Sequence, residues 1–188
     1  GLEFPDENAQ LPIVIQENPS RDYFFPISVD EAKQALDALP KLDRRGLTHL
    51  WFRRVDGNGQ RRELLEFICG GGFRLIVIYP WPKRMLVTWD KKPDSHSIRD
   101  YARCGIQVKR NSKGWFIEPD AASLKKYYLQ VLLFRGVGFH IDKYQRLWSK
   151  SKANHQHSIE FSDQYAMQKT QTATLVLSRI DKSRVASE

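Results

Sequence analysis

Cysteine is scarce in this chain, and long apolar segments are absent. The two cysteines, Cys69 and Cys104, form no CxxC pair and no cluster with histidine. This argues against a disulfide framework or a structural zinc site and favours a reducing cytoplasm. No apolar run reaches the ~18 residues that a membrane helix needs, so we expect no transmembrane segment. A Walker phosphate loop is also missing, because no glycine run leads to Gly-Lys-Ser or Gly-Lys-Thr.

Positive charge is plentiful. Thirty lysines and arginines stand against 22 acids, for a formal charge of +8. This balance favours anionic partners such as nucleic acid, nucleotides or an anionic membrane surface. Hydrophobic residues make up 41% of the 188 residues, enough for a core. We expect a single domain over residues 11–180, with residues 1–10 as an N-terminal arm or left by cloning, and a frayed tail over 181–188.

The first third of the chain combines short β-prone runs with one helix. Residues 11–15 are typical of a strand. A helix is predicted from Ser28, which can cap it, with Glu31 completing a capping box, up to Leu39. A second strand is predicted over residues 48–55.

The middle of the chain predicts further strands. Asn58-Gly59 favours a hairpin between residues 48–55 and a return strand over 63–68, because both turn residues tolerate positive φ. Residues 90–100 are polar and typical of a loop. The other expected strands cover residues 75–79, 85–89, 105–108 and 114–117, the last two as a second hairpin.

The last third changes period. Apolar residues spaced by three and four from Ser123 to Phe134 predict a long amphipathic helix, and residues 158–180 are again typical of a helix. The expected class is α+β: a mixed sheet with flanking helices and a helical C-terminal extension.

Three glycines precede an arginine at Gly70, Gly71, Gly72 and Arg74. A glycine turn can present successive backbone N–H groups to an anion, and an arginine can add a forked, permanently charged donor. These four residues are therefore candidates for binding a phosphate or nucleotide. The alternative is a tight turn between strands with a surface arginine.

The order of these features resembles the ParB/sulfiredoxin superfamily. That fold begins with a strand and an Asn-Pro…Arg turn, which Asn18, Pro19 and Arg21 match, followed by a helix, a glycine turn at Gly46 and a strand. Its phosphate motif, Gly-Gly-Cys-His-Arg in sulfiredoxins and Gly-x-x-Arg in ParB proteins, aligns with residues 70–74.

The departures from the sulfiredoxin motif are chemical. Gly72 stands where the reductase has its cysteine, and Phe73 where it has histidine. Reduction of sulfinic acids is therefore not expected, whereas binding of a phosphate or nucleotide remains. The resemblance covers roughly residues 11–90.

Later segments resemble the plasmid fertility inhibition factors within that superfamily. The segments that carry this likeness are residues 97–106 (SIRDYARCGI), 114–117 (GWFI), 132–136 (LLFRG) and 163–166 (DQYA). The likeness implies a plasmid-encoded protein of the bacterial cytoplasm that blocks conjugative or T-DNA transfer through a type IV secretion system. It also implies ATPase and DNase activities and interference at the coupling protein or the transferred nucleoprotein. Such a partner would also place the protein peripherally at the inner membrane.

Three residues are candidates for hydrolysis of a phosphate ester. Arg74 would hold the phosphate of ATP, the expected substrate, and Glu66 would assist a Mg²⁺ ion. His96 lies in a polar segment near carboxylates, where a histidine can act as a general base. Solvated side chains are the alternative for Glu66 and for His96.

Basic residues supply candidates for DNA contacts. Doublets bracket the expected hairpin, and two more arginines follow His96. The candidates are Arg53, Arg54, Arg61, Arg62, Arg99 and Arg103. Two other functions remain open: a non-enzymatic basic adaptor that blocks a secretion coupling protein by occupancy, and a DNA-binding regulator.

Overall fold

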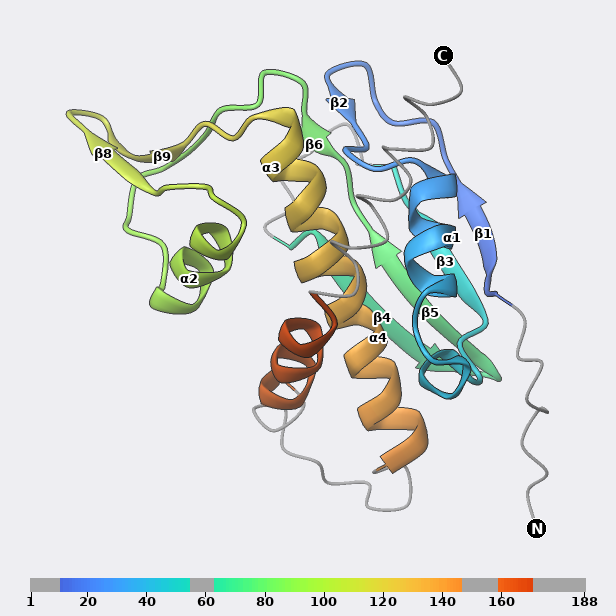
Figure 1. Cartoon of the computed structure of the whole chain (residues 1–188). Helices are drawn as coiled ribbons and strands as arrows, with labels where there is room; N and C mark the ends of the chain where they lie inside the picture. The colour runs from blue at the N-terminus through green and yellow to red at the C-terminus, as the bar shows by residue number, and fades with distance from the viewer. Residues whose placement is uncertain (1–10, 55–62, 147–158, 171–188) are drawn as a thin grey trace, which may run out of the picture.

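The protein is an α+β structure in which helices cover one face of a four-stranded mixed sheet (Figure 1). The computed structural model describes residues 11–54, 63–146 and 159–170. The strands of the main sheet are β1 (Ile13–Gln16), β3 (His49–Phe52), β4 (Leu65–Gly70) and β5 (Phe73–Ile78). Their order is β1-β3-β5-β4; β1 and β5 run parallel to β3, and β4 runs antiparallel to β5. The predicted class and the mixed sheet are confirmed.

The predicted hairpin between β3 and β4 is wrong. β5 lies between these two strands and pairs with both. Ile76, Val77 and Ile78 have no exposed surface, and a strand that is apolar on both faces is buried best in the middle of a sheet. The sequence therefore folds β4 back on β5 through the glycine run. Asn58-Gly59 lies outside the described residues.

One long helix crosses the covered face of the sheet, as the spacing of apolar residues predicts. It begins two residues before Ser123, because Asp120 caps it: the Asp120 side chain accepts a hydrogen bond from the Ser123 amide at 2.7 Å. The helix is continuous through four segments: α3 (Ala121–Lys126), the π-helical η2 (Tyr127–Leu133), α4 (Phe134–His140) and the π-helical η3 (Ile141–Arg146).

The long helix lies close to the sheet at Gly136. A Cβ atom at this position would lie 2.8 Å from Ile76 Cγ2, so a larger residue would push the helix away from β5. Leu50 and Phe52 of β3 and Ile78 of β5 point to the same side and are fully buried. The core therefore lies between the sheet and this helix.

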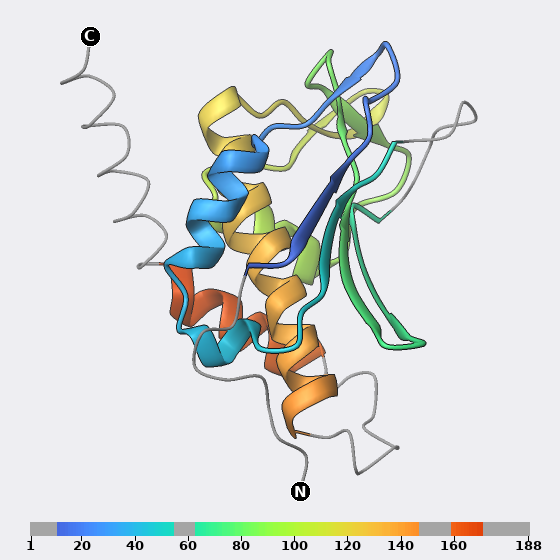
Figure 2. The same ribbon diagram turned by 90° about the vertical axis from the view of Figure 1, so that its right-hand side faces the viewer.

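The helix α1 (Val29–Asp37) packs on the same side of the sheet, as Figure 2 shows. The predicted capping box is present: the Ser28 hydroxyl accepts from the Glu31 amide at 3.0 Å, and a Glu31 carboxylate oxygen accepts from the Ser28 amide at 3.1 Å. A 3₁₀ turn, η1 (Lys41–Arg44), follows and leads into β3.

Two small sheets extend the molecule. One pairs β2 (Tyr23–Phe24) with β6 (Trp81–Pro82); the other has the order β7-β9-β8 and comprises β7 (Val87–Trp89), β8 (Lys109–Asn111) and β9 (Gly114–Ile117). The strand expected from residue 85 begins only at Val87, because Met85 has a φ of +67°. The strand expected over residues 105–108 is wrong: Gly105, with a φ of +79°, ends a helix instead.

The loop expected over residues 90–100 is also wrong in its second half, which belongs to α2 (Ser95–Arg103). The Asp94 side chain caps this helix by accepting from the Ser97 amide at 2.7 Å. Tyr101 is its one buried apolar residue, so the helix has too few apolar residues to mark it in the sequence. Residues 159–170 form the helix expected over 158–180 as far as the chain is described; residues 1–10 and 171–188 lie outside it.

Candidate functional site

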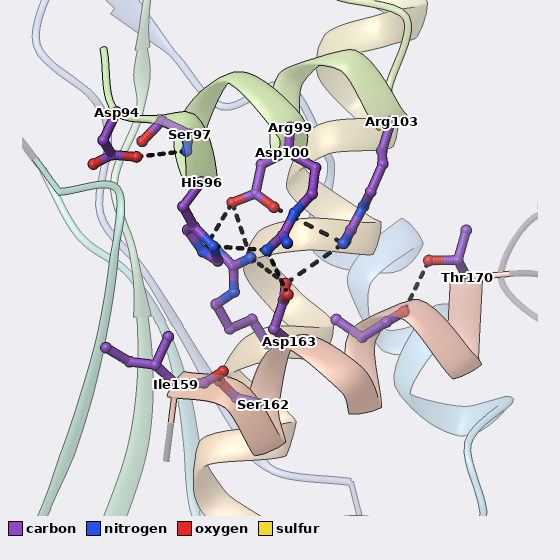
Figure 3. A network of polar contacts seen from close by, with 12 residues as sticks. Asp94, His96, Ser97, Arg99, Asp100, Arg103, Ile159, Ser162, Asp163 and Thr170 are labelled. Carbon is purple, nitrogen blue, oxygen red and sulfur yellow. Dashed lines mark hydrogen bonds and ion pairs between the residues drawn. The ribbon is translucent and has the colours of Figure 1, made fainter. Parts of the chain in front are cut away.

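Three helices meet at a network of charged side chains (Figure 3). Asp100 comes from α2, Arg135 from α4 and Asp163 from the helix at residues 159–170. Arg135 Nη2 donates to Asp100 Oδ2 at 2.9 Å and to Asp163 Oδ1 at 2.8 Å. The side chains of Arg135, Asp100 and Asp163 are 12%, 4% and 11% exposed. Arg135 therefore joins the three helices through charge-assisted hydrogen bonds in a largely buried place.

The solvent side of this network contains residues predicted for other roles. Arg99 Nη2 donates to Asp163 Oδ2 at 2.8 Å and lies 2.8 Å from His96 Nδ1. A guanidinium group can only donate, so Nδ1 accepts and the neutral ring carries its proton on Nε2, 3.4 Å from Asp100 Oδ2. Arg103 Nη1 lies 3.5 Å from Asp163 Oδ1. Both predicted DNA-binding arginines of α2 thus contact a carboxylate of this network.

The arginines keep Asp163 ionised. Burial by itself would raise the pKa of Asp163, but the hydrogen bond from Arg135 and the charges of Arg135, Arg103 and Arg99 outweigh it and lower the pKa. The acid therefore stays charged well below neutral pH. The ion pairs that link the three helices are therefore present at neutral pH.

The donor atoms of the network could reach a metal ion, but their surroundings do not fit one. Ligand atoms of His96, Asp100 and Asp163 lie within 4.8 Å of one another. Three guanidinium groups already face the two carboxylates, which leaves one net positive charge. A divalent cation would be repelled by that charge, because such ions are held where oxygen ligands supply an excess of negative charge. The network is best explained as a structural link between the three helices, and we call it the clasp.

Sequence reasoning singled out neither Arg135 nor Asp163. A signal was present, because Arg135 directly follows the apolar spacing that predicts the long helix and is a charged residue between the buried Phe134 and Gly136. Its partners could not be identified from spacing. Asp100, Arg135 and Asp163 belong to three of the segments that carry the family likeness, and the fold brings those segments together.

The glycine run is the tip of the β4–β5 hairpin. Gly70 pairs with Phe73, and Gly71 and Gly72 between them have φ values of +57° and +82°. A two-residue turn with positive φ at both positions matches the twist of the flanking strands, and glycine adopts it with little strain. The tight turn that was the alternative to a phosphate cradle therefore accounts for two of the three glycines.

The three residues predicted for catalysis are not brought together. Arg74 Nε donates to the Gly46 carbonyl, and its guanidinium lies 4.2 Å from the ring centre of Tyr144, on the helix side of the sheet. Glu66 pairs with Val77 in the register that pairs Cys69 with Arg74, so its side chain points to the opposite face. His96 lies in the clasp on α2.

The face of the main sheet opposite the helices is largely apolar; we call it the open face. Strand register and the alternation of side chains place its members in adjacent rows. The apolar and aromatic members are Ile13, Ile15, His49, Trp51, Ile68, Phe73, Leu75 and Val77, and Glu66 lies in the row of Val77.

Several side chains of the open face are strongly exposed. Ile13 is 65%, Phe73 53%, Ile15 40% and Ile68 39% exposed. The rings of His49 and Phe73 lie 5.5 Å apart. The face therefore combines aliphatic and aromatic contact area.

Basic residues predicted for DNA contacts lie at one end of this face. The Arg53 guanidinium lies 4.8 Å from the centre of the Trp51 ring, and Arg53 Nη1 donates to the Tyr79 hydroxyl at 3.3 Å. Arg54 Nε donates to the Ser20 hydroxyl at 3.2 Å. Both side chains make contacts within the protein; Arg61 and Arg62 lie outside the described residues.

Comparison with known proteins adds no relative. No family model, curated protein or solved structure matches the chain. Among the described residues, no helix is both long enough and apolar enough to cross a membrane.

Proposed function

We propose that the protein is a plasmid fertility inhibition factor with the ParB/sulfiredoxin fold that blocks DNA transfer through a type IV secretion system by occupancy. The open face docks on an apolar surface of the secretion coupling protein. The likeness in residues 97–106, 132–136 and 163–166 supports the family. The exposed apolar side chains of the open face support the mode of action.

The observation that carries this proposal is the gathering of exposed apolar side chains on one face. Of the six large hydrophobic residues that are strongly exposed in the described part of the chain, four belong to the open face. Single exposed hydrophobic residues are ordinary, but a contiguous group marks a surface that another molecule covers. Trp51 and Phe73 supply the aromatic anchors that contribute most to protein–protein interfaces.

The charge of the open face favours a protein partner over a polyanion. Arg53 and Glu66 lie in neighbouring rows at the same end of the face, with β5 between them, and have opposite charges. A surface with balanced charge gains little from a string of phosphates. The two charged side chains lie at one end of the face, away from Ile13, Ile68 and Phe73. The burial of these three apolar side chains on a partner protein can therefore provide most of the binding free energy.

Occupancy also agrees better with the placement of the predicted catalytic residues than hydrolysis does. ATPase and DNase activity would need Arg74, Glu66 and a base to converge on one phosphate. Arg74 contacts Gly46 on one side of the sheet, whereas Glu66 points to the other. Inhibition by docking requires no such convergence.

The test is an inhibition assay in donor cells that express the chain. We expect Phe73→Asp to relieve inhibition of plasmid or T-DNA transfer at least tenfold, because a carboxylate buried in an apolar interface loses its water without gaining a partner. Ile13→Asp should act in the same way from another strand. The same variants should lose retention of the purified cytoplasmic domain of the coupling protein.

Met167→Asp is the matched control, because Met167 has the same 53% exposure as Phe73 but lies on the helix at residues 159–170. It should inhibit like the wild type. Circular dichroism melts establish that each variant is folded. Full inhibition by both folded open-face variants would exclude docking through this face, and absence of inhibition by the wild type in every transfer system tried would exclude the family assignment.

A further inference from the structure

The hairpin of β8 and β9 is the most basic exposed element of the described chain. Figure 1 shows it projecting from the body of the molecule, at the end away from β1. Its residues 109–117 contain three cations and no acid. Lys109, Arg110 and Lys113 are all exposed, and within the described residues none of them forms an ion pair. Their charge is therefore available to a partner.

A neighbouring loop adds to this charge around Trp115. Lys92 Nζ lies 5.3 Å from the centre of the Trp115 ring, and the Arg110 guanidinium lies 5.4 Å from it. Cation–π contacts of this kind hold long basic side chains on a defined surface. Trp115 is half-buried and two cations lie beside its ring, so an unpaired base would compete with them for contact with the ring.

The residues at the tip of the hairpin indicate whether its anionic partner is a lipid surface or a nucleic acid. It consists of Asn111, Ser112, Lys113 and Gly114, and the Asn111 side chain accepts a hydrogen bond from the Lys113 amide at 2.9 Å. An element that binds a lipid surface inserts apolar or aromatic side chains below the headgroups. This tip has none to insert, so a nucleic acid fits its chemistry better than a membrane.

We propose that the β8–β9 hairpin is a binding site for double-stranded DNA. A two-stranded β-ribbon fits the width of the major groove, and lysines and an arginine along it can reach phosphates on both sides. The cations beside the half-buried Trp115 ring favour contact with the duplex backbone over stacking on single strands. This site is separate from the open face and does not depend on the proposed docking function.

The test is the binding of a labelled 20-base-pair duplex to the full chain, measured by fluorescence anisotropy at several salt concentrations. The triple variant Lys109→Ala/Arg110→Ala/Lys113→Ala should bind at least tenfold more weakly at low salt. Its slope of log K against log salt should be lower by about three, because each phosphate contact contributes roughly one unit. Competition with unlabelled single strands of the same length should require a higher concentration than competition with duplex.

The matched control removes the same charge elsewhere. Arg21, Lys33 and Lys41 are exposed and lie outside the hairpin, so Arg21→Ala/Lys33→Ala/Lys41→Ala should bind duplex within about twofold of the wild type. Equal losses in the two triple variants would show binding by net charge alone and overturn the proposal. So would unchanged duplex binding by the hairpin variant in a folded state.

Two further measurements separate duplex binding from lipid binding and from docking at the open face. Vesicles of one part phosphatidylglycerol to three parts phosphatidylcholine should not retain the wild type; hairpin-dependent retention on them without duplex binding would assign the hairpin to lipid. Phe73→Asp should bind duplex like the wild type, so a failure of docking at the open face leaves this result unchanged.

Discussion

The open face and the β8–β9 hairpin are both exposed β-structure, yet their side chains are of opposite kinds. The open face presents isoleucines and a phenylalanine that are 39–65% exposed. The hairpin presents only polar and charged side chains along β8, with Trp115 flanked by Lys92 and Arg110. Apolar area is stabilised when a partner covers it, whereas exposed cations attract anions and remain solvated without one. The comparison therefore assigns two different partners to two parts of one chain.

The largest expected effect is a loss of stability in α2 and the β8–β9 hairpin, with a smaller loss beneath the open face. Arg135→Met keeps the length of the side chain but removes the partner closest to both Asp100 and Asp163, which leaves only Arg103, at 3.9 and 3.5 Å, near both carboxylates. Removing one member of a buried ion network costs about 3–5 kcal/mol, and the network holds α2, which connects β7 to β8. Hydrogen exchange should increase first in α2 and the hairpin. Protection in β3 and β5, beneath the open face, should fall less.

The matched control for this variant is Arg99→Ala. Arg99 contacts Asp163 in the same network, but its side chain is 54% exposed. An exposed ion pair contributes about 1 kcal/mol or less, so this variant should melt close to the wild type. Equal destabilisation by the two substitutions would contradict the role of Arg135 as the buried centre of the clasp.

A smaller effect, dependent on pH, should act at the covered face of the main sheet, beneath the open face. His140 lies under β4, where its ring is 6.1 Å from that of Phe67 and its Nε2–H donates to the Arg45 carbonyl at 2.6 Å. Burial, together with a smaller contribution from the charge of Arg74, lowers the pKa of His140 to about 4 against the opposing effect of the Arg45 hydrogen bond.

The direction of the pH effect follows from the difference between the pKa of His140 in the unfolded and in the folded chain. The unfolded chain takes up a proton near pH 6.5, whereas folded His140 does so only near pH 4. Its contribution to stability is therefore complete above pH 6.5 and is lost as the pH falls toward 4, a decrease of about 3 kcal/mol in the free energy of unfolding. Urea titrations across this range measure it. The folded His140→Gln variant should show a shallower dependence; a slope equal to that of the wild type would rule His140 out as its source.

The smallest expected effect concerns the β4–β5 turn, which is next to Phe73 of the open face. Gly71→Ala places a side chain at a φ of +57° and should destabilise the protein by about 1 kcal/mol. Gly70→Ala is the control, because that residue has no positive φ and no atom within 4 Å of the added Cβ. Thermal melts compare the two variants. Equal melting temperatures would show that the turn does not need glycine at position 71.

Locally encoded features could be predicted from the sequence, and the candidate sites could not. The capping box at Ser28 and Glu31 and the apolar spacing of the long helix depend on residues three or four apart, so both are confirmed. α2 was missed because it has few apolar residues, although Asp94 was available as an N-cap signal. Arg99 and Arg103 could be counted as cations, but their carboxylate partner, Asp163, is some sixty residues away in the chain.

What the sequence by itself determined is the strands of the main sheet, the capped helix α1, the long helix and the positive charge, with a tight turn at the glycine run as one of two possibilities. Only the tertiary structure decided that β5 lies between β3 and β4, which turned Arg74 to the covered side and Glu66 to the open face. It also decided which apolar side chains stay exposed. The physical reason is that caps and periodic spacing act within a few residues, whereas strand order and burial depend on the total apolar area that distant segments remove from water together.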